Sequence, residues 1–507
     1  MFYFLTHMID EKLAGLELAM INRLNVFNYN NEEAKIVTFH FNRFQHMNTQ
    51  KYGISDHDYV NLFDYFQETV DIDDQKILDN YLTKILEKIN QSFPNNYLVK
   101  HNNFLEVYQD GNKVVEITFF RNSKDRVSNV KWYGFDNKLI REDGYDSRGF
   151  LSISSFFGQK GGVASEDVYN IRGQVVINFY YHETDNNNSI SNTSIHLNYK
   201  HNHKVFNDLQ ELTAFFYDDL VKDSNSIFIV DRSYLVDASV FKMKNKVKVF
   251  EFWHNTFSST NNQYGSLSNV MVQELLHNQK ISGYILPTKK GADELKNRIP
   301  KIIPVYNATV AINKVNHHYS SYFDPDKIIM VARIDRQKQI HHAIKAFSII
   351  HKKRPNAKLY IYGYIFDNEY NLELLSLTKK LGLVDYIVYE HYRSDKDSIY
   401  KDAAVMIMTS RNEGWGMVIN ESLARGIPVV SYDTCYGPSE IITNGDDGYI
   451  VEINDYVSLS ERVLHILCNK NIRKTLSLNG VKNMERYNIE NVSLIWKDLS
   501  KKLLNDK

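Results

Sequence analysis

Short apolar runs alternate with helical patterns along most of the chain. The runs are rich in Ile, Val and aromatic residues, and polar turns bound them, which is typical of strands buried on both faces. Because helical patterns separate the runs, we expect parallel strands in doubly wound sheets. The predicted strands of a first sheet are residues 2–5, 34–39, 226–230, 247–252 and 283–287. Those of a second sheet are residues 327–332, 357–362, 386–389, 404–408 and 428–431.

From about residue 98 to residue 200 the pattern changes to an alternation of apolar and polar positions. Residues 104–108 and 114–120 flank an Asp-Gly-Asn turn, which predicts a β-hairpin. A weak repeat of aromatic residue, Asx turn and return strand follows, as in an antiparallel meander. We interpret the meander as an insertion that serves acceptor binding or oligomerisation, with a spacer role as the alternative.

These changes of pattern divide a chain that is too long for a single core. The first Rossmann-like domain is predicted in two parts, residues 1–80 and 206–305, on either side of the meander at residues 81–205. A second Rossmann-like domain takes residues 306–480. Residues 481–507 are predicted as a C-terminal amphipathic helix that packs back on the first domain.

Composition and charge limit the classes of function. The 507 residues are 43% hydrophobic and 24% charged, and the formal net charge of −1 gives no global basic field for nucleic acid. The two cysteines, Cys435 and Cys468, are too few for a disulfide framework. The N-terminus lacks a basic leader, and no stretch is apolar enough to span a bilayer. We therefore expect a cytoplasmic protein without a transmembrane segment, with peripheral membrane association left open.

The most informative stretch is residues 413–421, Glu-Gly-Trp-Gly-Met-Val-Ile-Asn-Glu, between a predicted strand and a predicted helix. Gly414 and Gly416 let the backbone approach a ligand, and the helix start offers free N–H groups to a phosphate. Glu413 lies on the loop, and Glu421 is expected two turns into the helix. Such a site suits a phosphorylated, hydroxyl-rich ligand, and a sugar nucleotide fits it.

Further polar residues follow other strands of the second sheet. Arg333 and Lys338 lie on the loop after residues 327–332, where doubly wound folds bind ligands, and together they suit a diphosphate. Gly363 ends the next strand and would admit a base or ribose, although a glycine there can simply turn the chain. His391 follows residues 386–389 and could frame a nucleobase edge.

Two positions in the first domain complete the candidate site. His254 follows residues 247–252 and would face the cleft between the domains, although a single histidine more often has a structural role. Gly15 opens the first helix, with N–H groups available to a phosphate or an acceptor. The histidine pairs 201/203 and 341/342 lack companion ligands, so no metal site is predicted.

Arg333, Lys338, Gly363 and the loop at residues 413–421, in this order on one α/β domain, resemble the retaining GT-B glycosyltransferases of family 4. Residues 436–440 and 444–451 continue the resemblance. It implies a GT-B fold, with two Rossmann-like domains and here an inserted antiparallel meander. A meander in the first domain looks like the bacterial group that glycosylates wall teichoic acid or serine-rich and serine-aspartate surface proteins.

The resemblance also implies roles. Glu413 and His254 would lie at the donor sugar, Arg333 and Lys338 would hold the diphosphate, and Glu421 would accept hydrogen bonds from the ribose. The further residues implied in donor binding are Gly15, Gly363, His391, Gly414, Trp415, Gly416, Met417 and Val418. Trp415 stands where a smaller residue is common and would narrow the sugar site, and Tyr364 replaces a frequent glycine. No metal or other cofactor is expected.

Together these features predict transfer of N-acetylglucosamine from UDP-GlcNAc to serines of a repetitive bacterial surface protein, without nucleic acid. One alternative is α-glycosylation of teichoic acid, from UDP-GlcNAc or UDP-glucose. For that polyanion the meander should present a basic stripe, for which Lys131, Arg141, Arg148, Lys160 and Arg172 are candidates. Another alternative is a non-catalytic, glycosyltransferase-like binding partner. A homo-oligomer through the meander is also compatible with the pattern.

Overall fold

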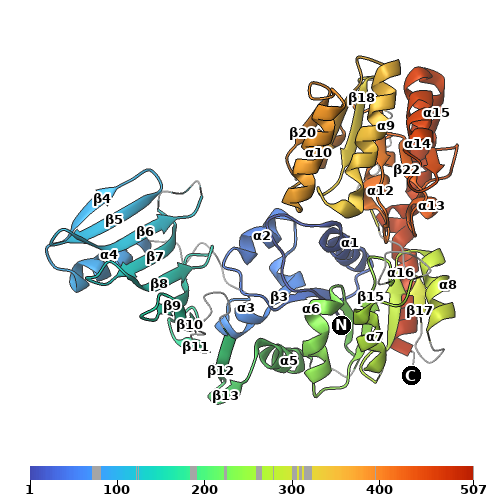
Figure 1. Ribbon diagram of the computed structural model, residues 1–507. Coiled ribbons are helices and arrows are strands. Elements are labelled where there is room, and N and C mark those ends of the chain that lie inside the picture. Colours follow the sequence, from blue (N-terminus) through green and yellow to red (C-terminus); the bar gives the residue numbers. More distant parts are fainter. Residues whose placement is uncertain are drawn as a thin grey trace. The chain divides into compact units, whose positions relative to one another are not determined.

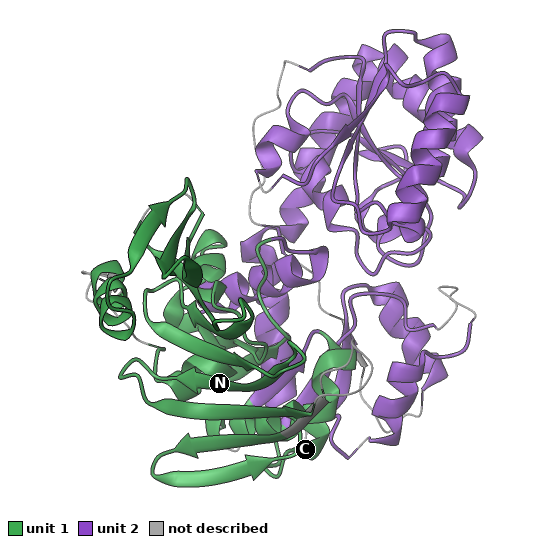
Figure 2. Ribbon diagram, turned by 60° about the vertical axis from the view of Figure 1, so that its left-hand side comes forward, with its two compact units in different colours: residues 1–11, 34–226, 232–247 green, residues 12–33, 227–231, 248–507 purple. Residues whose placement is uncertain are grey.

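The protein is an α/β molecule in which parallel and antiparallel sheets occupy different parts of the chain (Figure 1). The computed structural model describes residues 1–70, 81–121, 123, 125–182, 191–221, 225–258, 265–277, 279–299, 305–307, 311–312, 323–393 and 395–505. The chain forms two compact units (Figure 2). Unit 1 comprises Met1–Glu11, Ala34–Ser226 and Arg232–Val247; unit 2 comprises Lys12–Glu33, Ile227–Asp231 and Lys248–Lys507.

Unit 1 contains parallel strands and the inserted meander. Its parallel strands follow the order β1 (Phe2–Leu5), β2 (Ala34–Thr38) and β3 (Tyr59–Asn61), and nearly all their residues are buried. Its helices are α2 (Gln45–Lys51), α3 (Leu62–Gln67), α4 (Tyr81–Ser92), α5 (Leu209–Leu220) and α6 (Ser233–Lys242).

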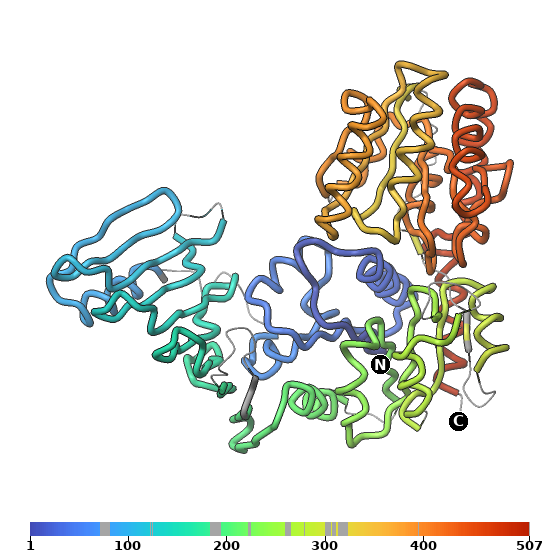
Figure 3. Tube along the Cα trace, viewed as in Figure 1, coloured from blue at the N-terminus to red at the C-terminus, as the bar shows by residue number. Residues whose placement is uncertain are grey.

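The meander is a ten-stranded antiparallel sheet whose strand order follows the sequence, as Figure 3 shows along the trace. Its strands are β4 (Tyr97–Lys100), β5 (Phe104–Gln109), β6 (Asn112–Phe119), β7 (Val127–Tyr133), β8 (Leu139–Tyr145), β9 (Leu151–Phe157), β10 (Val163–Tyr169), β11 (Val175–His182), β12 (Ser191–Tyr199) and β13 (Asn202–Phe206). Asp110 and Gly111 both have positive φ, 51° and 79°, which suits the tight turn between β5 and β6. The predicted hairpin and meander are confirmed.

Unit 2 contains two sets of parallel strands. The first has the order β17 (Val305–Asn307), β16 (Gly283–Leu286), β15 (Lys248–Phe252) and β14 (Ile227–Val230). The helices of this part are α1 (Gly15–Tyr29), α7 (Asn269–Leu276) and α8 (Lys289–Arg298).

The second set is a six-stranded parallel sheet with the order β20-β19-β18-β21-β22-β23. Its strands are β18 (Lys327–Val331), β19 (Lys358–Tyr362), β20 (Ile387–Glu390), β21 (Val405–Met408), β22 (Val429–Tyr432) and β23 (Gly448–Val451). The helices that follow them are α9 (Ile340–Lys353), α10 (Asn368–Lys380), α11 (Lys396–Tyr400), α12 (Met417–Leu423), α13 (Pro438–Ile441), α14 (Tyr456–Cys468) and α15 (Lys470–Met484). Buried side chains of α9, α10, α14 and the strands form one core, as the alternating pattern predicts.

Two details differ from the sequence prediction. Residues 481–484 still belong to α15, and the terminal helix α16 (Ile489–Asn505) begins later than expected because a 3-10 turn at Glu485–Tyr487 separates the two. Trp496 of α16 packs against Phe27 of α1 and Phe252 of β15, with ring centroids 5.6 and 6.2 Å apart. The predicted domain boundaries remain predictions, and the one at residue 80 lies outside the described residues.

Among the helices that the structure describes, none is both long enough and apolar enough to cross a bilayer.

Candidate functional site

The loops at the carboxyl end of the six-stranded sheet bring Lys338 and Glu413 together. Lys338 ends the 3-10 turn Arg336–Lys338 after β18, and Glu413 lies between β21 and α12. Lys338 Nζ donates to Glu413 Oε1 at 2.6 Å, and their side chains are 16% and 14% exposed. This short, largely buried ion pair supplies one fixed positive and one fixed negative charge at the place where parallel α/β sheets bind ligands.

One side-chain and one backbone hydrogen bond join the Lys338 loop to the Glu413 loop. Gln337 Nε2 donates to Asn412 O at 3.1 Å, and Arg411 N donates to Gln337 O at 2.8 Å. Arg333, predicted beside the diphosphate, lies at the start of the same loop, and its guanidinium pairs with Asp335 at 2.9 Å. Each of the two side chains predicted to bind the diphosphate, Arg333 and Lys338, is therefore paired with a carboxylate.

Glu421 belongs to a separate group of side chains. It lies one turn into α12 rather than two, because the helix begins only at Met417. Lys396 forms a short ion pair with Glu421 Oε1, and the Tyr400 hydroxyl donates to Oε2 at 3.0 Å. Burial first, and then the Glu421 carboxylate, raise the pKa of Tyr400 well above its ordinary value. A ribose that binds Glu421 would therefore share its oxygens with Lys396 and Tyr400.

The folded structure requires glycine at several positions of the site, for reasons that the sequence did not reveal. A Cβ on Gly414 would lie 1.8 Å from the backbone oxygen of His254, so this glycine admits another loop of the protein. Gly416 has a φ of 95° and caps α12. A Cβ on Gly363 would lie 1.9 Å from Ala332 O, so its bare backbone packs on the end of β18. Glycine was expected at positions 414, 416 and 363 because it admits a ligand. Packing and capping within the protein give an alternative reason for glycine at these positions.

His254 is held by a buried carboxylate that is itself paired with a buried guanidinium. Asp231 follows β14, and its Oδ1 lies 2.6 Å from His254 Nε2, while its Oδ2 forms a short ion pair with Arg23 of α1. Because a carboxylate only accepts hydrogen bonds, the Nε2 of His254 carries the hydrogen. Arg23 is 3% exposed, and its burial lowers the pKa of the guanidinium while Asp231 opposes that shift. Asp231, which is itself held by Arg23, thus fixes the orientation of the His254 imidazole.

The loop after β15 also contacts the loops of the six-stranded sheet. Asn412 Nδ2 donates to Thr256 Oγ1 at 3.2 Å and to Asn255 Oδ1 at 3.3 Å. Glu440 accepts from the backbone N–H groups of Lys289 and Lys290, at 3.0 and 2.6 Å, at the start of α8. Within unit 2, His254 and Glu413 thus lie on loops in direct contact.

The remaining predicted residues are more scattered. Gly15 is exposed at the start of α1, where Glu17 Oε2 already accepts from Ala14 N at 3.1 Å. His391 is exposed after β20. Trp415 is 5% exposed and packs edge-on against Tyr487, 5.2 Å away, and its narrowing of the sugar site remains a prediction. Met417 and Val418 are half-buried at the start of α12, and their predicted contacts with phosphate remain predictions.

Four residues at the site were missed by the sequence prediction. Asp231 directly follows a buried strand, a signal that could have identified it. Arg23, Lys396 and Tyr400 carry no such signal, because their partners lie far away along the chain. Only the folded arrangement shows that they act on Asp231 and Glu421.

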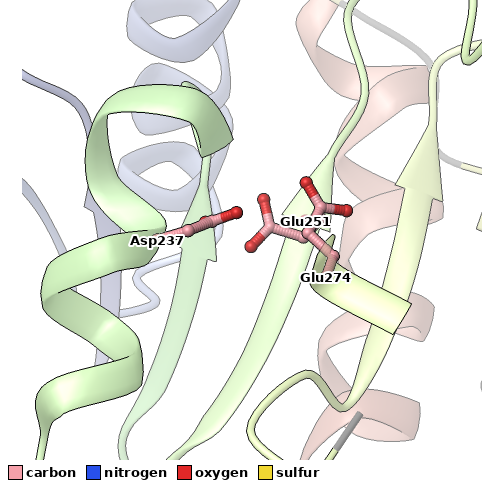
Figure 4. Close-up of side chains that lie close together, drawn as sticks. All are labelled: Asp237, Glu251 and Glu274. Atoms are coloured by element: carbon pink, nitrogen blue, oxygen red, sulfur yellow. The ribbon is translucent and has the colours of Figure 1, made fainter. Parts of the chain in front are cut away.

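A pair of buried carboxylates was also missed. Glu251 of β15 and Glu274 of α7 are both fully buried, and their oxygens approach within 4.8 Å (Figure 4). Acidic groups in proximity are common without a bound ion, so the pair by itself assigns no metal.

Comparisons with known proteins agree with this geometry. Residues 317–483 match the family "Glycosyl transferases group 1", and residues 97–207 match the "GtfB middle domain". The first match covers the loops that carry Lys338, Glu413 and Glu421, and the second covers the meander.

Relatives match along nearly the whole chain. The poly(ribitol-phosphate) alpha-N-acetylglucosaminyltransferase of Staphylococcus aureus is 24% identical over 98% of this chain and 99% of its own length. The GtfA subunit of the UDP-N-acetylglucosamine–peptide N-acetylglucosaminyltransferase of Streptococcus gordonii is 20% identical over 97% of both chains. The fold resembles the pneumococcal O-GlcNAc transferase GtfA solved with UDP and GlcNAc, with a TM-score of 0.83, 21% identity, and coverage of 100% of this chain and 99% of that one. With its parallel sheets, inserted meander and group 1 domain, the chain is a GT-B glycosyltransferase of group 1 with a GtfB middle domain.

Proposed function

We propose that this glycosyltransferase moves N-acetylglucosamine from UDP-GlcNAc to serine residues of a repetitive bacterial surface protein. The donor part of the proposal rests on the Lys338–Glu413 pair at the carboxyl end of the six-stranded sheet. The acceptor part rests on the meander. Relatives named for peptide and for polyol-phosphate acceptors both match the chain, so the choice between them needs an observation of its own.

That observation is the charge pairing of the meander. Four of the basic residues that could form a stripe for phosphates face carboxylates of the same unit. Lys131 lies 3.8 Å from Glu116, and Arg141 lies 2.6 Å from Asp143. Arg148 is buried between Asp64 and Asp146, and Arg172 pairs with Glu68 at 2.5 Å. Paired in this way, these four side chains bring no uncompensated positive charge to the meander, so the meander suits a serine-rich acceptor better than a polyol phosphate.

On the donor side, Lys338 and Arg333 would exchange Glu413 and Asp335 for the diphosphate of the donor. The cations would then neutralise the charge that develops on the leaving UDP as the glycosidic bond breaks. Glu413, freed from Lys338, would accept hydrogen bonds from hydroxyls of the sugar. Glu421, with Lys396 and Tyr400 behind it, would accept from the ribose. His254, fixed by Asp231, would lie beside the sugar.

We further propose a retaining, front-face displacement that needs no metal ion. In such a step the acceptor hydroxyl attacks on the face from which UDP leaves, and a donor phosphate oxygen takes the hydroxyl proton. The bond from carbon to the serine oxygen forms as the bond to UDP breaks. The support is the basic pair Arg333 and Lys338, which could carry the role that a cation has in other transferases.

The test offers UDP-GlcNAc and UDP-glucose in parallel with a serine-rich repeat peptide and a ribitol-phosphate polymer. Labelling of the peptide from UDP-GlcNAc is the expected result, unchanged by a chelator, with the α-anomer in the product. Labelling of the polymer alone would overturn the acceptor proposal. It would favour the second candidate, teichoic acid glycosylation, which the full-length similarity to the poly(ribitol-phosphate) enzyme supports.

A further inference from the structure

Unit 1 holds an open pocket of about 340 Å³ that the donor site does not use. One wall is a face of the meander, and the other comes from residues 40–43, α3 and the start of α5. Its volume lies within the roughly 300–1,000 Å³ typical of small-molecule sites. A pocket of this size accepts a single sugar ring.

The meander wall is a row of side chains that the strand register sets side by side. Glu142 on β8 pairs with Ser155 on β9, Ser155 pairs with Glu166 on β10, and Glu166 pairs with Phe179 on β11. Residues paired directly across an antiparallel sheet point to the same face. The four side chains therefore line one face of four successive strands.

The polar groups of this row are held in place by short hydrogen bonds. Glu166 accepts from Ser155 Oγ at 2.6 Å and from the Tyr181 hydroxyl at 2.5 Å, and Glu142 accepts from Asn129 Nδ2 at 2.6 Å. All five side chains remain partly exposed to the pocket. Fixed carboxylates with exposed edges are good acceptors for ligand hydroxyl groups.

Aromatic rings form the apolar part of the pocket. Phe41 packs on Phe63 at 4.9 Å, Phe63 lies 6.2 Å from Phe179, and Phe179 stacks with Tyr181 at 6.4 Å. Aromatic faces beside hydrogen-bond acceptors are suited to ligands that are apolar on one side and hydroxylated at the edge. A pyranose ring has this form, with C–H groups on its face and hydroxyls around its rim.

The charge of the pocket excludes phosphates and acidic peptides. Arg43 is the basic lining residue, and its guanidinium already donates to Ser128 O at 2.6 Å and to Tyr145 O at 3.2 Å. Glu142 and Glu166 outnumber the Arg43 guanidinium among the charged lining residues, so a further negative charge is repelled. The pocket suits a neutral, hydroxyl-rich ligand.

We propose that this pocket is a second sugar-binding site, which holds a neutral pyranose already attached to the acceptor. The proposal rests on the proposed function in identifying that sugar as N-acetylglucosamine and its carrier as the acceptor. An enzyme with such a site would bind a partly glycosylated acceptor more tightly than a bare one, so transfer would speed up as the first sugars are added. The meander would then recognise the glycosylated product.

The test measures sugar binding apart from transfer. Methyl α-N-acetylglucosaminide is titrated into the full chain by saturation-transfer NMR, with UDP in excess to occupy the donor site. Ser155→Trp fills the pocket, and Tyr181→Ala removes one aromatic wall and a donor to Glu166. Tyr180→Ala is the matched control, because Tyr180 is the neighbouring residue on β11, points to the opposite face and is 43% exposed.

Binding that persists with UDP, falls at least about tenfold in Ser155→Trp and several-fold in Tyr181→Ala, and is unchanged in Tyr180→Ala is the expected result. Absence of UDP-resistant binding would overturn the inference, and so would equal losses in Tyr181→Ala and Tyr180→Ala. Competition by a ribitol-phosphate polymer or an acidic peptide as strong as that by the sugar would overturn it too. Transfer to peptide is assayed separately, so a failure of the proposed function leaves a positive binding result standing.

Discussion

The loops of the six-stranded sheet and the pocket of the meander differ in how they hold charge. In the loops, each candidate cation has a carboxylate partner: Lys338 with Glu413, Arg333 with Asp335, and Lys396 with Glu421. In the meander pocket, aromatic rings and two carboxylates form the walls, and Arg43 is bound to backbone oxygens.

The two regions recognise ligands in different ways. Ion pairs in the loops hold the positive charges in position before a donor arrives, and an anionic donor replaces the carboxylates one by one. In the pocket the Arg43 guanidinium is held by backbone oxygens beside an excess of carboxylates, so shape and hydroxyl contacts must carry the affinity of the pocket. Substitutions in the loops should therefore change turnover, whereas substitutions in the pocket should change only acceptor binding.

The largest effect is expected from Glu413→Ala. Loss of this carboxylate removes a contact to the donor sugar and leaves Lys338 without its partner, so turnover should fall about 100- to 1,000-fold. The measurement is the rate of UDP release with and without acceptor. Arg336→Ala is the matched control, because Arg336 is on the same loop, is 52% exposed and pairs with the surface residue Glu373. Equal losses in both variants would contradict the site assignment.

The next largest effect is expected from Gly414→Ala. The added Cβ would meet His254 O at 1.8 Å, so one of the two loops must move. Displacements of about 1 Å can cost roughly 100-fold in rate, and overpacking costs about 1–3 kcal/mol of stability. Turnover and the thermal midpoint are measured together. In Gly382→Ala, the control, the positive φ of 68° lowers stability, but among the described residues nothing lies within 4 Å of the added Cβ, so turnover at a temperature where the variant is folded should stay normal. Normal turnover in Gly414→Ala would show that the loops do not depend on each other.

Asp231→Asn should have a smaller effect on turnover and a clear effect on stability. The substitution leaves the buried Arg23 guanidinium without an anion, and breaking such a pair costs about 3–5 kcal/mol. His254 then faces a neutral amide in place of the carboxylate that fixes its ring. Urea unfolding measures the first consequence, and turnover at a temperature where the variant is folded measures the second. Unchanged stability would mean that water reaches Arg23.

The smallest effect concerns acid sensitivity of the six-stranded domain. Burial first, and then His341 and Lys345, lower the pKa of His342 from its ordinary 6.5 to about 4. Below pH 6.5 the unfolded chain binds a proton here that the folded chain binds only near pH 4. The stabilising contribution is therefore complete above pH 6.5 and is lost as the pH falls toward 4. His342→Gln should flatten the change in urea midpoint between pH 7 and pH 5, and a slope equal to that of the wild type would refute this.

The sequence predicted those parts of the fold that depend on local pattern. The strands β18 to β22 and the hairpin around Gly111 follow from apolar runs and turn residues close together in the chain. Likewise, Glu413 and Lys338 could be expected near each other because both follow strands of one parallel sheet. The start of α12 was less certain, since Gly416 caps it at a positive φ that no periodicity indicates.

Features that depend on long-range packing could not be predicted in this way. Gly414 and Gly363 were interpreted as openings for a ligand, and the structure fills both with backbone oxygens from other loops. Arg23 pairs with Asp231, which lies 208 positions away in the sequence, and neither residue type indicates its partner. The pocket of the meander required the register of four strands, which a weak repeat does not define.

The carbonyl oxygen of His254 occupies the space that a side chain at position 414 would need. This has a consequence for protein engineering. Libraries that seek a new donor specificity usually randomise the loop beside the sugar, but position 414 tolerates a single residue type. Useful diversity is expected instead at Tyr364 and His391, which follow β19 and β20 and are not fully buried. A selection on this scaffold should therefore return glycine at 414 in every survivor while these two sites diverge.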